Sequence, residues 1–265
     1  MSRMRASVED RIHLTVLAFF ALQVGYLLCI TVVFALPAFR LAAFIAASAI
    51  YHGLFYLGLR RVQREFALEA TGSPLRAINF PLVLSFLRLS SVPAAIFLFL
   101  SIGSISISLV LAPFLVVVFL TDLLDGLLAR ILHQQTRIGR IVDAAGDYVL
   151  IFTLTVLFAL FELIPWWLAA LVLFRLVLQS AGIVALYRLR GYSSLKLTFL
   201  GKASVFSVFC LYGFELAEYM SLPLIGSPRL ISVLELLTAG VIAASLVDKV
   251  LFLRREIRAV RGQQS

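Results

Sequence analysis

The sequence predicts an all-α, polytopic membrane protein built as a helical bundle. Of its 265 residues, 62% are hydrophobic, and the charged residues gather between long apolar runs. The mean hydropathy of +1.04 is far above that of a soluble domain. A helix of about 20 apolar residues crosses the hydrocarbon core of a bilayer. The chain therefore has room for about eight spans with short connections, and for no separate soluble domain.

Apolar runs bounded by charges, proline or glycine define the expected spans. These are residues 13–36, 42–59, 80–102, 105–132, 141–163, 166–187, 203–222 and 230–252. The first two are extra N-terminal spans in an expected domain 1–60, and the other six form a core over residues 79–255. Residues 256–265 are expected to be a cytoplasmic tail. The first apolar run is too long for a signal peptide, so it is expected to remain as an uncleaved span.

Residues 61–78 form the longest polar connection, and they include Phe66 and Leu68 among arginines and glutamates. This mixture predicts a short amphipathic helix that lies on the lipid headgroups and is broken at Gly72 and Pro74. A solvated linker is the alternative interpretation of the same residues.

The basic residues predict the orientation of the chain in the membrane. Nearly all of the 23 lysines and arginines fall on one side of the eight expected spans. The other side receives Arg40 and Arg229, while Arg88 and Arg175 lie inside spans. This bias predicts cytoplasmic termini and a cytoplasmic turn at 133–140, in a bacterial-type inner or plasma membrane. It also explains the net charge of +9 without a nucleic-acid partner.

Four carboxylates interrupt the apolar sequence at Asp122, Asp125, Asp143 and Asp147. A charge at bilayer depth costs about 2.5 to 3.5 kcal/mol, so these residues need a cation or a function. Spacings of three and four residues place each pair on one face of a helix. The polar segment between the pairs, which contains Gly139, predicts a turn between two antiparallel helices. The four carboxylates are therefore expected to form one acidic cluster that opens toward the turn.

Clustered carboxylates without histidine or cysteine favour Mg²⁺ or Mn²⁺, and Mg²⁺ commonly bridges a carboxylate site to a phosphate-bearing substrate. Gly126 and Gly139 remove side chains where a ligand would approach the helix backbone. Arg130 would place a fixed positive charge beside that phosphate. His13, His52 and His133 are isolated in the sequence, and no arrangement of His, Cys or Ser suggests a covalent nucleophile.

The complete spacing resembles the signature of the CDP-alcohol phosphotransferase family. It reads Asp122-x2-Asp125-Gly126-x2-Ala129-Arg130-x8-Gly139-x3-Asp143-x3-Asp147. Asn79, Ser85, Arg88 and Pro93 also resemble the pattern with which the family core begins, with Ser85 in place of the usual threonine. The resemblance covers residues 76 to 255 and leaves the first 60 residues outside.

This resemblance implies a transferase of phospholipid biosynthesis. It would move the phosphatidyl group of CDP-diacylglycerol onto a hydroxyl of a small polar, phosphorylated acceptor and release CMP by direct displacement. The resemblance also implies a homodimer, two Mg²⁺ or Mn²⁺ ions and Asp147 as general base. Its metal ligands would be Asp122, Asp125, Asp143 and Asp147, and its CDP-binding residues would be Asp122, Asp125, Gly126, Ala129, Arg130, Gly139, Asp143 and Ser85.

The acceptor is less closely defined. Arg175, Lys202, Lys196 and Arg88 are candidate acceptor-binding or phosphate-binding residues, and their charge suits glycerol 3-phosphate or inositol phosphate. The segment after Arg175 lacks the Glu and second Arg associated with phosphatidylglycerophosphate synthases. A lipid acceptor, as in cardiolipin formation, and transfer from CDP-choline or CDP-ethanolamine to diacylglycerol stay open.

Two other classes of protein are alternatives. An ion-coupled transporter would show uptake without CMP release. A non-catalytic membrane scaffold that keeps the acidic cluster as a structural metal site would tolerate Asp147→Asn.

Overall fold

The computed structural model describes the backbone of residues 2–69, 71–73, 75, 78–101, 105–190, 199–220 and 228–262. Side chains are described for these residues except 2–8, 105–108, 122, 123, 183, 185–190, 228 and 256–262. Within this part of the chain, the regular structure is helical apart from one isolated bridge between Leu68 and Thr136. The all-α prediction is confirmed.

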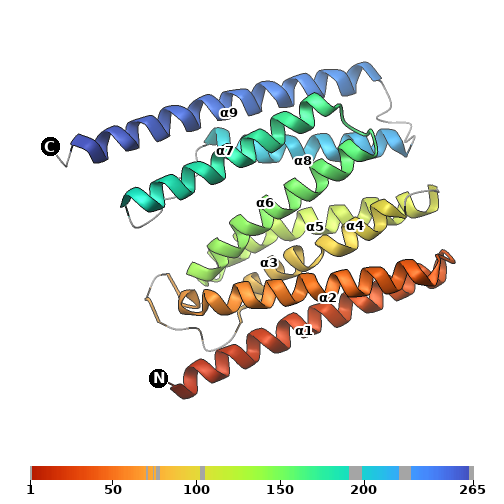
Figure 1. Cartoon of the computed structure of the whole chain (residues 1–265), viewed down its shortest axis with the longest axis horizontal. Coiled ribbons are helices and arrows are strands. Elements are labelled where there is room, and N and C mark those ends of the chain that lie inside the picture. Colours follow the sequence, from red (N-terminus) through yellow and green to blue (C-terminus); the bar gives the residue numbers. More distant parts are fainter. Residues whose placement is uncertain are drawn as a thin grey trace. The chain divides into compact units, whose positions relative to one another are not determined.

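The helices fall into two compact units, residues 1–153 and 154–265. The first contains α1 (Ser2–Val33), α2 (Ala38–Arg61), the 3-10 turn η1 (Gln63–Glu65), α3 (Phe80–Ser90), α4 (Val92–Leu100), α5 (Ile105–Ile131) and most of α6 (Arg137–Leu160). The second contains α7 (Trp166–Arg190), α8 (Phe199–Tyr219) and α9 (Pro228–Gly262). In the first unit α1 pairs with α2 and α3 packs against α5, and in the second α9 runs along α7 and α8 (Figure 1).

Seven helical stretches in the described residues are long and apolar enough to cross a membrane. They are Glu9–Val33, Ala38–Arg61, Phe80–Leu100, Leu109–Ile131, Arg137–Leu160, Phe199–Tyr219 and Arg229–Arg255. The remaining expected span, 166–187, is helical as α7, but its described apolar stretch, Trp166–Gly182, is shorter than these seven. The chain is therefore an integral membrane protein.

The span Phe80–Leu100 has the largest buried share of the seven, 72%, and it is broken in the middle. Pro93 causes the break because it has no amide hydrogen to donate to the carbonyl of Leu89, four residues earlier. As a result α3 ends at Ser90 and α4 begins at Val92. The hydroxyl of Ser91 donates to the Arg88 carbonyl at 2.6 Å, which satisfies one acceptor at the break.

The amphipathic helix predicted for residues 61–78 is not formed in the described part of this stretch. After η1 the backbone becomes extended, and Leu68 pairs with Thr136. The Glu69 amide donates to the Gln135 carbonyl at 3.0 Å, and the Arg137 amide donates to the Ala67 carbonyl at 3.1 Å. The linker is thus hydrogen-bonded to the turn between α5 and α6. The backbone of that turn provides fixed donors and acceptors, which lipid headgroups would not.

The turn between α5 and α6 is shorter than the predicted 133–140. At the end of α5, His133 adopts a left-handed φ of 52°. Its amide donates to the Arg130 carbonyl, and the Gln134 amide to the Ala129 carbonyl, as in a Schellman motif. The Thr136 hydroxyl then accepts from the Gly139 amide at 2.9 Å and caps α6. Gly139 therefore lies in the first turn of α6 and not in the connection.

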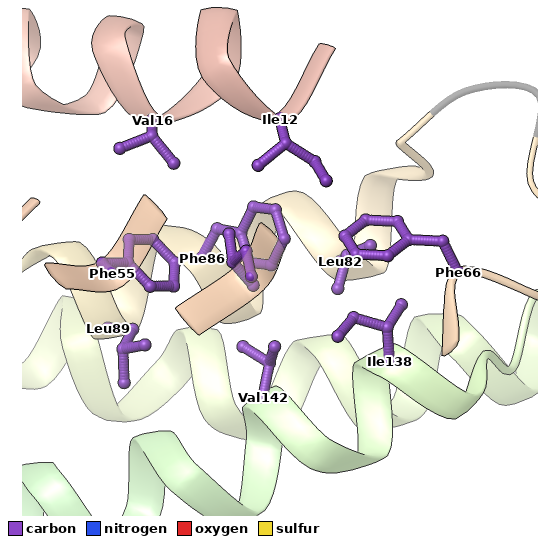
Figure 2. Packing of buried hydrophobic residues seen from close by; sticks show 10 residues of the cluster. Ile12, Val16, Phe55, Phe66, Leu82, Phe86, Leu89, Ile138 and Val142 are labelled. Atoms are coloured by element: carbon purple, nitrogen blue, oxygen red, sulfur yellow. The ribbon is translucent and has the colours of Figure 1, made fainter. Parts of the chain in front are cut away.

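A hydrophobic cluster joins the N-terminal helices to α3 and α6. Its buried members are Ile12, Val16, Phe55, Leu59, Phe66, Leu82, Phe86, Leu89, Ile138 and Val142. Side chains of α1 and of α6 point from opposite sides toward the layer that contains Phe86 and Leu82 (Figure 2). Phe66 of the linker is also buried there, at 4% exposure, which explains why it does not face the headgroups. The hairpin of α1 and α2 therefore shares one core with α3 and with α6, the helix that carries Asp143 and Asp147.

Candidate active site

One turn of α3 carries two side chains that reach the carboxylates of α5 and α6. The first is Ser85, whose hydroxyl donates to Oδ2 of Asp125 at 2.7 Å. Both residues are 4% exposed. A hydroxyl that donates to a buried carboxylate satisfies one of its lone pairs and fixes its orientation. The serine at the position where the resemblance implies threonine therefore keeps a polar contact inside the site.

The second side chain is Arg88, which is 1% exposed and pairs with both carboxylates of α6. Its Nη2 donates to Oδ1 of Asp143 at 2.6 Å and to the Asp143 carbonyl at 3.2 Å. Its Nη1 lies 3.3 Å from Oδ1 of Asp147. The buried guanidinium thus places one positive charge between two neighbouring carboxyl groups. The structure thus places Arg88, predicted to bind acceptor or phosphate, among the expected metal ligands.

Gly146 is a site residue that the sequence analysis missed. A Cβ atom at this position would lie 3.1 Å from Nε and 3.2 Å from Nη2 of Arg88. The missing side chain leaves the space in which the guanidinium lies across α6. The available signal was a glycine immediately before Asp147, on the turn of helix between the two aspartates. Its partner, Arg88, is far away in the sequence, so the spacing alone could not reveal the contact.

The face of α5 that follows Asp125 is open. Among the described residues, a Cβ at Gly126 would meet no atom within 4 Å outside the neighbouring backbone of its own helix, in contrast to Gly146. Arg130 is exposed, and its Nε donates to the Gly126 carbonyl at 3.0 Å. Ala129 is half-buried. This face leaves space for a ligand beside the exposed positive charge of Arg130. At Gly139, by contrast, a Cβ would lie 2.7 Å from the Thr136 hydroxyl, so the helix cap already accounts for that glycine.

The donor atoms suit a hard cation. The described oxygens come from Asp125, Asp143 and Asp147, and the side chain of Asp122 lies outside the described residues. Among the side chains that are described, no three His, Cys, Asp or Glu residues are arranged to hold a metal ion. Oδ1 of Asp147 is nevertheless buried and accepts no hydrogen bond from the part of the chain that is described, although Nη1 of Arg88 lies 3.3 Å away. Carboxylate oxygens of this kind fit Mg²⁺ or Mn²⁺ by their chemistry.

The remaining candidate residues belong to the second unit. Arg175 is 3% exposed, and its Nη2 donates to the Gly201 carbonyl at 3.1 Å, which joins α7 to the beginning of α8. Lys202, which follows Gly201 on α8, is exposed. Lys196 lies outside the described residues. A role of these three residues in binding the acceptor stays a prediction.

Removing the Ser85 hydroxyl tests its contact with Asp125. We expect Ser85→Ala to lower the turnover of the site about tenfold, because a buried carboxylate oxygen loses its donor and its fixed orientation. Ser85→Thr keeps the hydroxyl and is expected to stay within about twofold of the unmodified protein. Product formation by the two purified variants measures the difference. Equal turnover of both variants would show that this hydrogen bond has no part in the reaction.

Comparison with known proteins identifies a similar region. Residues 78–243 match the family model described as CDP-alcohol phosphatidyltransferase. A protein of Mycobacterium tuberculosis named putative cardiolipin synthase is 34% identical over 131 residues, which is 49% of this chain and 61% of that protein. The cardiolipin synthase (CMP-forming) of Streptomyces coelicolor is 33% identical over 151 residues, 53% of this chain and 65% of that protein. The chain thus spans less than two thirds of these relatives. No solved structure is significantly similar to the chain.

Proposed function

Since the chain belongs to the CDP-alcohol phosphatidyltransferase family, we propose that it moves the phosphatidyl group of CDP-diacylglycerol to an acceptor hydroxyl and releases CMP. The observation that carries the proposal is the contact of α3 with the signature carboxylates of two other helices. Ser85 binds Asp125, and Arg88 binds Asp143 and Asp147. Phosphoryl transfer depends mainly on positioning and on charge neutralisation, and this arrangement of fixed carboxylates suits both.

Asp147 is the proposed general base. Its Oδ1 accepts no hydrogen bond from the described residues, which leaves a lone pair for the proton of the acceptor hydroxyl. The hydroxyl oxygen forms a bond to the phosphatidyl phosphorus, and the bond from that phosphorus to the CMP oxygen breaks, with the electron pair leaving on CMP. Arg88 holds Asp147 and Asp143 in register along α6 while the proton moves.

The family is generally dependent on divalent metal ions. Asp122, Asp125, Asp143 and Asp147 are the proposed ligands of two Mg²⁺ or Mn²⁺ ions, which when bound would neutralise the diphosphate and the leaving group. For the nucleotide, we propose that Arg130 exchanges the Gly126 carbonyl for a phosphate oxygen of CDP. The open face at Gly126 allows the diphosphate to approach the α5 backbone.

The acceptor that the relatives favour is a lipid. Both relatives are named as cardiolipin synthases, one of them as CMP-forming. Cardiolipin contains two phosphatidyl groups joined through glycerol, so its formation from CDP-diacylglycerol with release of CMP requires a phosphatidylglycerol hydroxyl. We therefore propose phosphatidylglycerol as the acceptor. A small phosphorylated acceptor such as glycerol 3-phosphate is the second candidate, favoured by the exposed charge of Lys202.

The orientation and the assembly of the protein are part of the proposal. The basic residues favour cytoplasmic termini and an active site that opens to the cytoplasm. The family resemblance favours a homodimer. The mass of the protein in a lipid nanodisc tests the assembly, and a single chain per particle would exclude the dimer.

The identity of the lipid product tests the acceptor directly. The purified protein in nanodiscs is given CDP-diacylglycerol with phosphatidylglycerol, with glycerol 3-phosphate or with no acceptor, and the lipids are analysed by mass spectrometry. The proposal predicts cardiolipin, formed only with phosphatidylglycerol. If a lipid product formed with glycerol 3-phosphate and not with phosphatidylglycerol, the acceptor would be the second candidate, glycerol 3-phosphate. A product from CDP-choline or CDP-ethanolamine and diacylglycerol, and none from CDP-diacylglycerol, would show that the proposed donor is wrong.

A further inference from the structure

Side chains of α1 and α2 satisfy the backbone acceptors at the break between α3 and α4. Pro93 leaves the Leu89 carbonyl without its helical donor, and the Tyr51 hydroxyl of α2 donates to this oxygen at 2.8 Å. The next carbonyl, that of Ser90, accepts from Nε2 of Gln23 on α1 at 2.9 Å. A helix end inside a protein needs such partners, because water cannot supply them there.

His52 extends these contacts into a buried network. Its Nδ1 lies 2.8 Å from the Ser48 carbonyl, and its Nε2 lies 2.7 Å from the Ser90 hydroxyl. A carbonyl oxygen can only accept, so Nδ1 carries the hydrogen and Nε2 of the neutral ring accepts from Ser90. The Ser48 hydroxyl donates in turn to Oε1 of Gln23. The four side chains are each no more than 6% exposed. His52, isolated in the sequence, is thus part of a connected polar network.

These contacts lie directly beside the proposed site. Leu89 and Ser90 follow Arg88 on α3, and the Arg88 carbonyl itself accepts from Ser91 at the break. The side chain of Arg88 extends from α3 to two carboxylates on α6, and its guanidinium lies against the backbone at Gly146. A displacement of the end of α3 would therefore be transmitted to the two ion pairs.

We propose that the hairpin of α1 and α2 is a brace that positions Arg88 against Asp143 and Asp147 by holding the broken end of α3. Tyr51, His52 and Gln23 act as positioning residues and do not touch the substrate. All three lie outside residues 78–243, the part that matches the family model. The brace is therefore a property of this chain that the family match does not contain, and its effect on turnover rests on the proposed function.

The smallest change that tests the brace is Tyr51→Phe, which removes one hydroxyl and keeps the ring. The matched control is Tyr26→Phe on α1, where the ring stacks on Phe114 with a centroid distance of 5.6 Å. We expect Tyr51→Phe to lower kcat about tenfold with KM for CDP-diacylglycerol within about twofold, because the site is misplaced while the substrate contacts remain. Tyr26→Phe is expected to keep the unmodified kcat.

A double-variant cycle separates positioning from general stability. If Tyr51 acts through Arg88, then Tyr51→Phe is expected to lower kcat by less than about twofold in an Arg88→Lys background. A full tenfold loss in that background would overturn the proposal, and so would an unchanged kcat of Tyr51→Phe in the otherwise unmodified protein.

Hydrogen exchange tests the brace without any activity. Backbone amides of residues 84–92 are expected to exchange faster in Tyr51→Phe than in Tyr26→Phe, because the break in the helix has lost a partner. Equal exchange in the two variants would overturn the brace. If the unmodified protein releases no CMP, the proposed function fails, while the exchange experiment still decides whether the hairpin holds the end of α3.

Discussion

The Asp147→Asn variant is expected to release CMP at about one thousandth of the unmodified rate, because an amide cannot take the proton of the acceptor hydroxyl. Asparagine has nearly the same size as aspartate, so the packing around Gly146 and Arg88 is preserved. The measurement is the amount of CMP released from CDP-diacylglycerol in lipid nanodiscs at saturating acceptor.

The control for this prediction is Asp10→Asn, which changes an exposed carboxylate of α1 in the same way. It is expected to leave the rate unchanged. Thermal unfolding of both variants shows whether they are folded. If folded Asp147→Asn released CMP as fast as the unmodified protein, Asp147 would not be the base, and the alternative of a non-catalytic scaffold would gain support for this site.

The Arg88→Gln variant is expected to lose both stability and turnover. Removing Arg88 leaves the two carboxylates without their counterion, and the loss of one partner of a buried ion pair costs about 3 to 5 kcal/mol. We expect a cost of about 3 kcal/mol, at the lower end of this range, because the Asp143 side chain is 46% exposed and water can solvate it. The free energy of unfolding, measured in detergent with a chelator present, is expected to fall by this amount. Mn²⁺ added in excess of the chelator is expected to restore part of the lost free energy of unfolding, since a divalent cation can replace the lost positive charge.

Arg130→Gln is the matched control for the stability effect. Arg130 is exposed, and among the described residues its side chain donates to a backbone carbonyl of its own helix. Its replacement is therefore expected to lower turnover, through the proposed contact with CDP, while the free energy of unfolding changes by less than about 0.5 kcal/mol. Equal stability of the two variants would show that the pairs of Arg88 with Asp143 and Asp147 contribute little to the fold.

The helices and the aspartate pairs were predictable because both depend on local spacing. A span needs only a sufficient run of apolar residues, and the three-residue and four-residue spacings of the aspartates place each pair on a helix face whatever surrounds it. Asp143 and Asp147 lie on one face of α6 and form ion pairs with Arg88, and Asp125 of α5 accepts a hydrogen bond from Ser85. The motif residues were therefore identified before their partners were known.

The contacts between distant segments were not predictable, because they depend on which elements meet. Phe66 was predicted to lie on an interfacial helix at the lipid headgroups. It is instead buried in the hydrophobic cluster, and Leu68 pairs with Thr136, so the linker is extended there. Gly139 suited a turn, yet the cap by Thr136 starts α6 earlier. The contacts of His52 with Ser90 and of Gly146 with Arg88 could not be predicted, because these partners are far apart along the chain.

The most direct test of the proposed reaction is metal-dependent release of CMP from CDP-diacylglycerol by the unmodified protein in nanodiscs that contain phosphatidylglycerol. The account predicts one CMP for each new phosphodiester, loss of release with EDTA, and its return with Mg²⁺ or Mn²⁺. Release no higher than that of protein-free nanodiscs, from a folded protein with metal and every proposed donor and acceptor present, would contradict the assignment of the carboxylate cluster to phosphatidyl transfer.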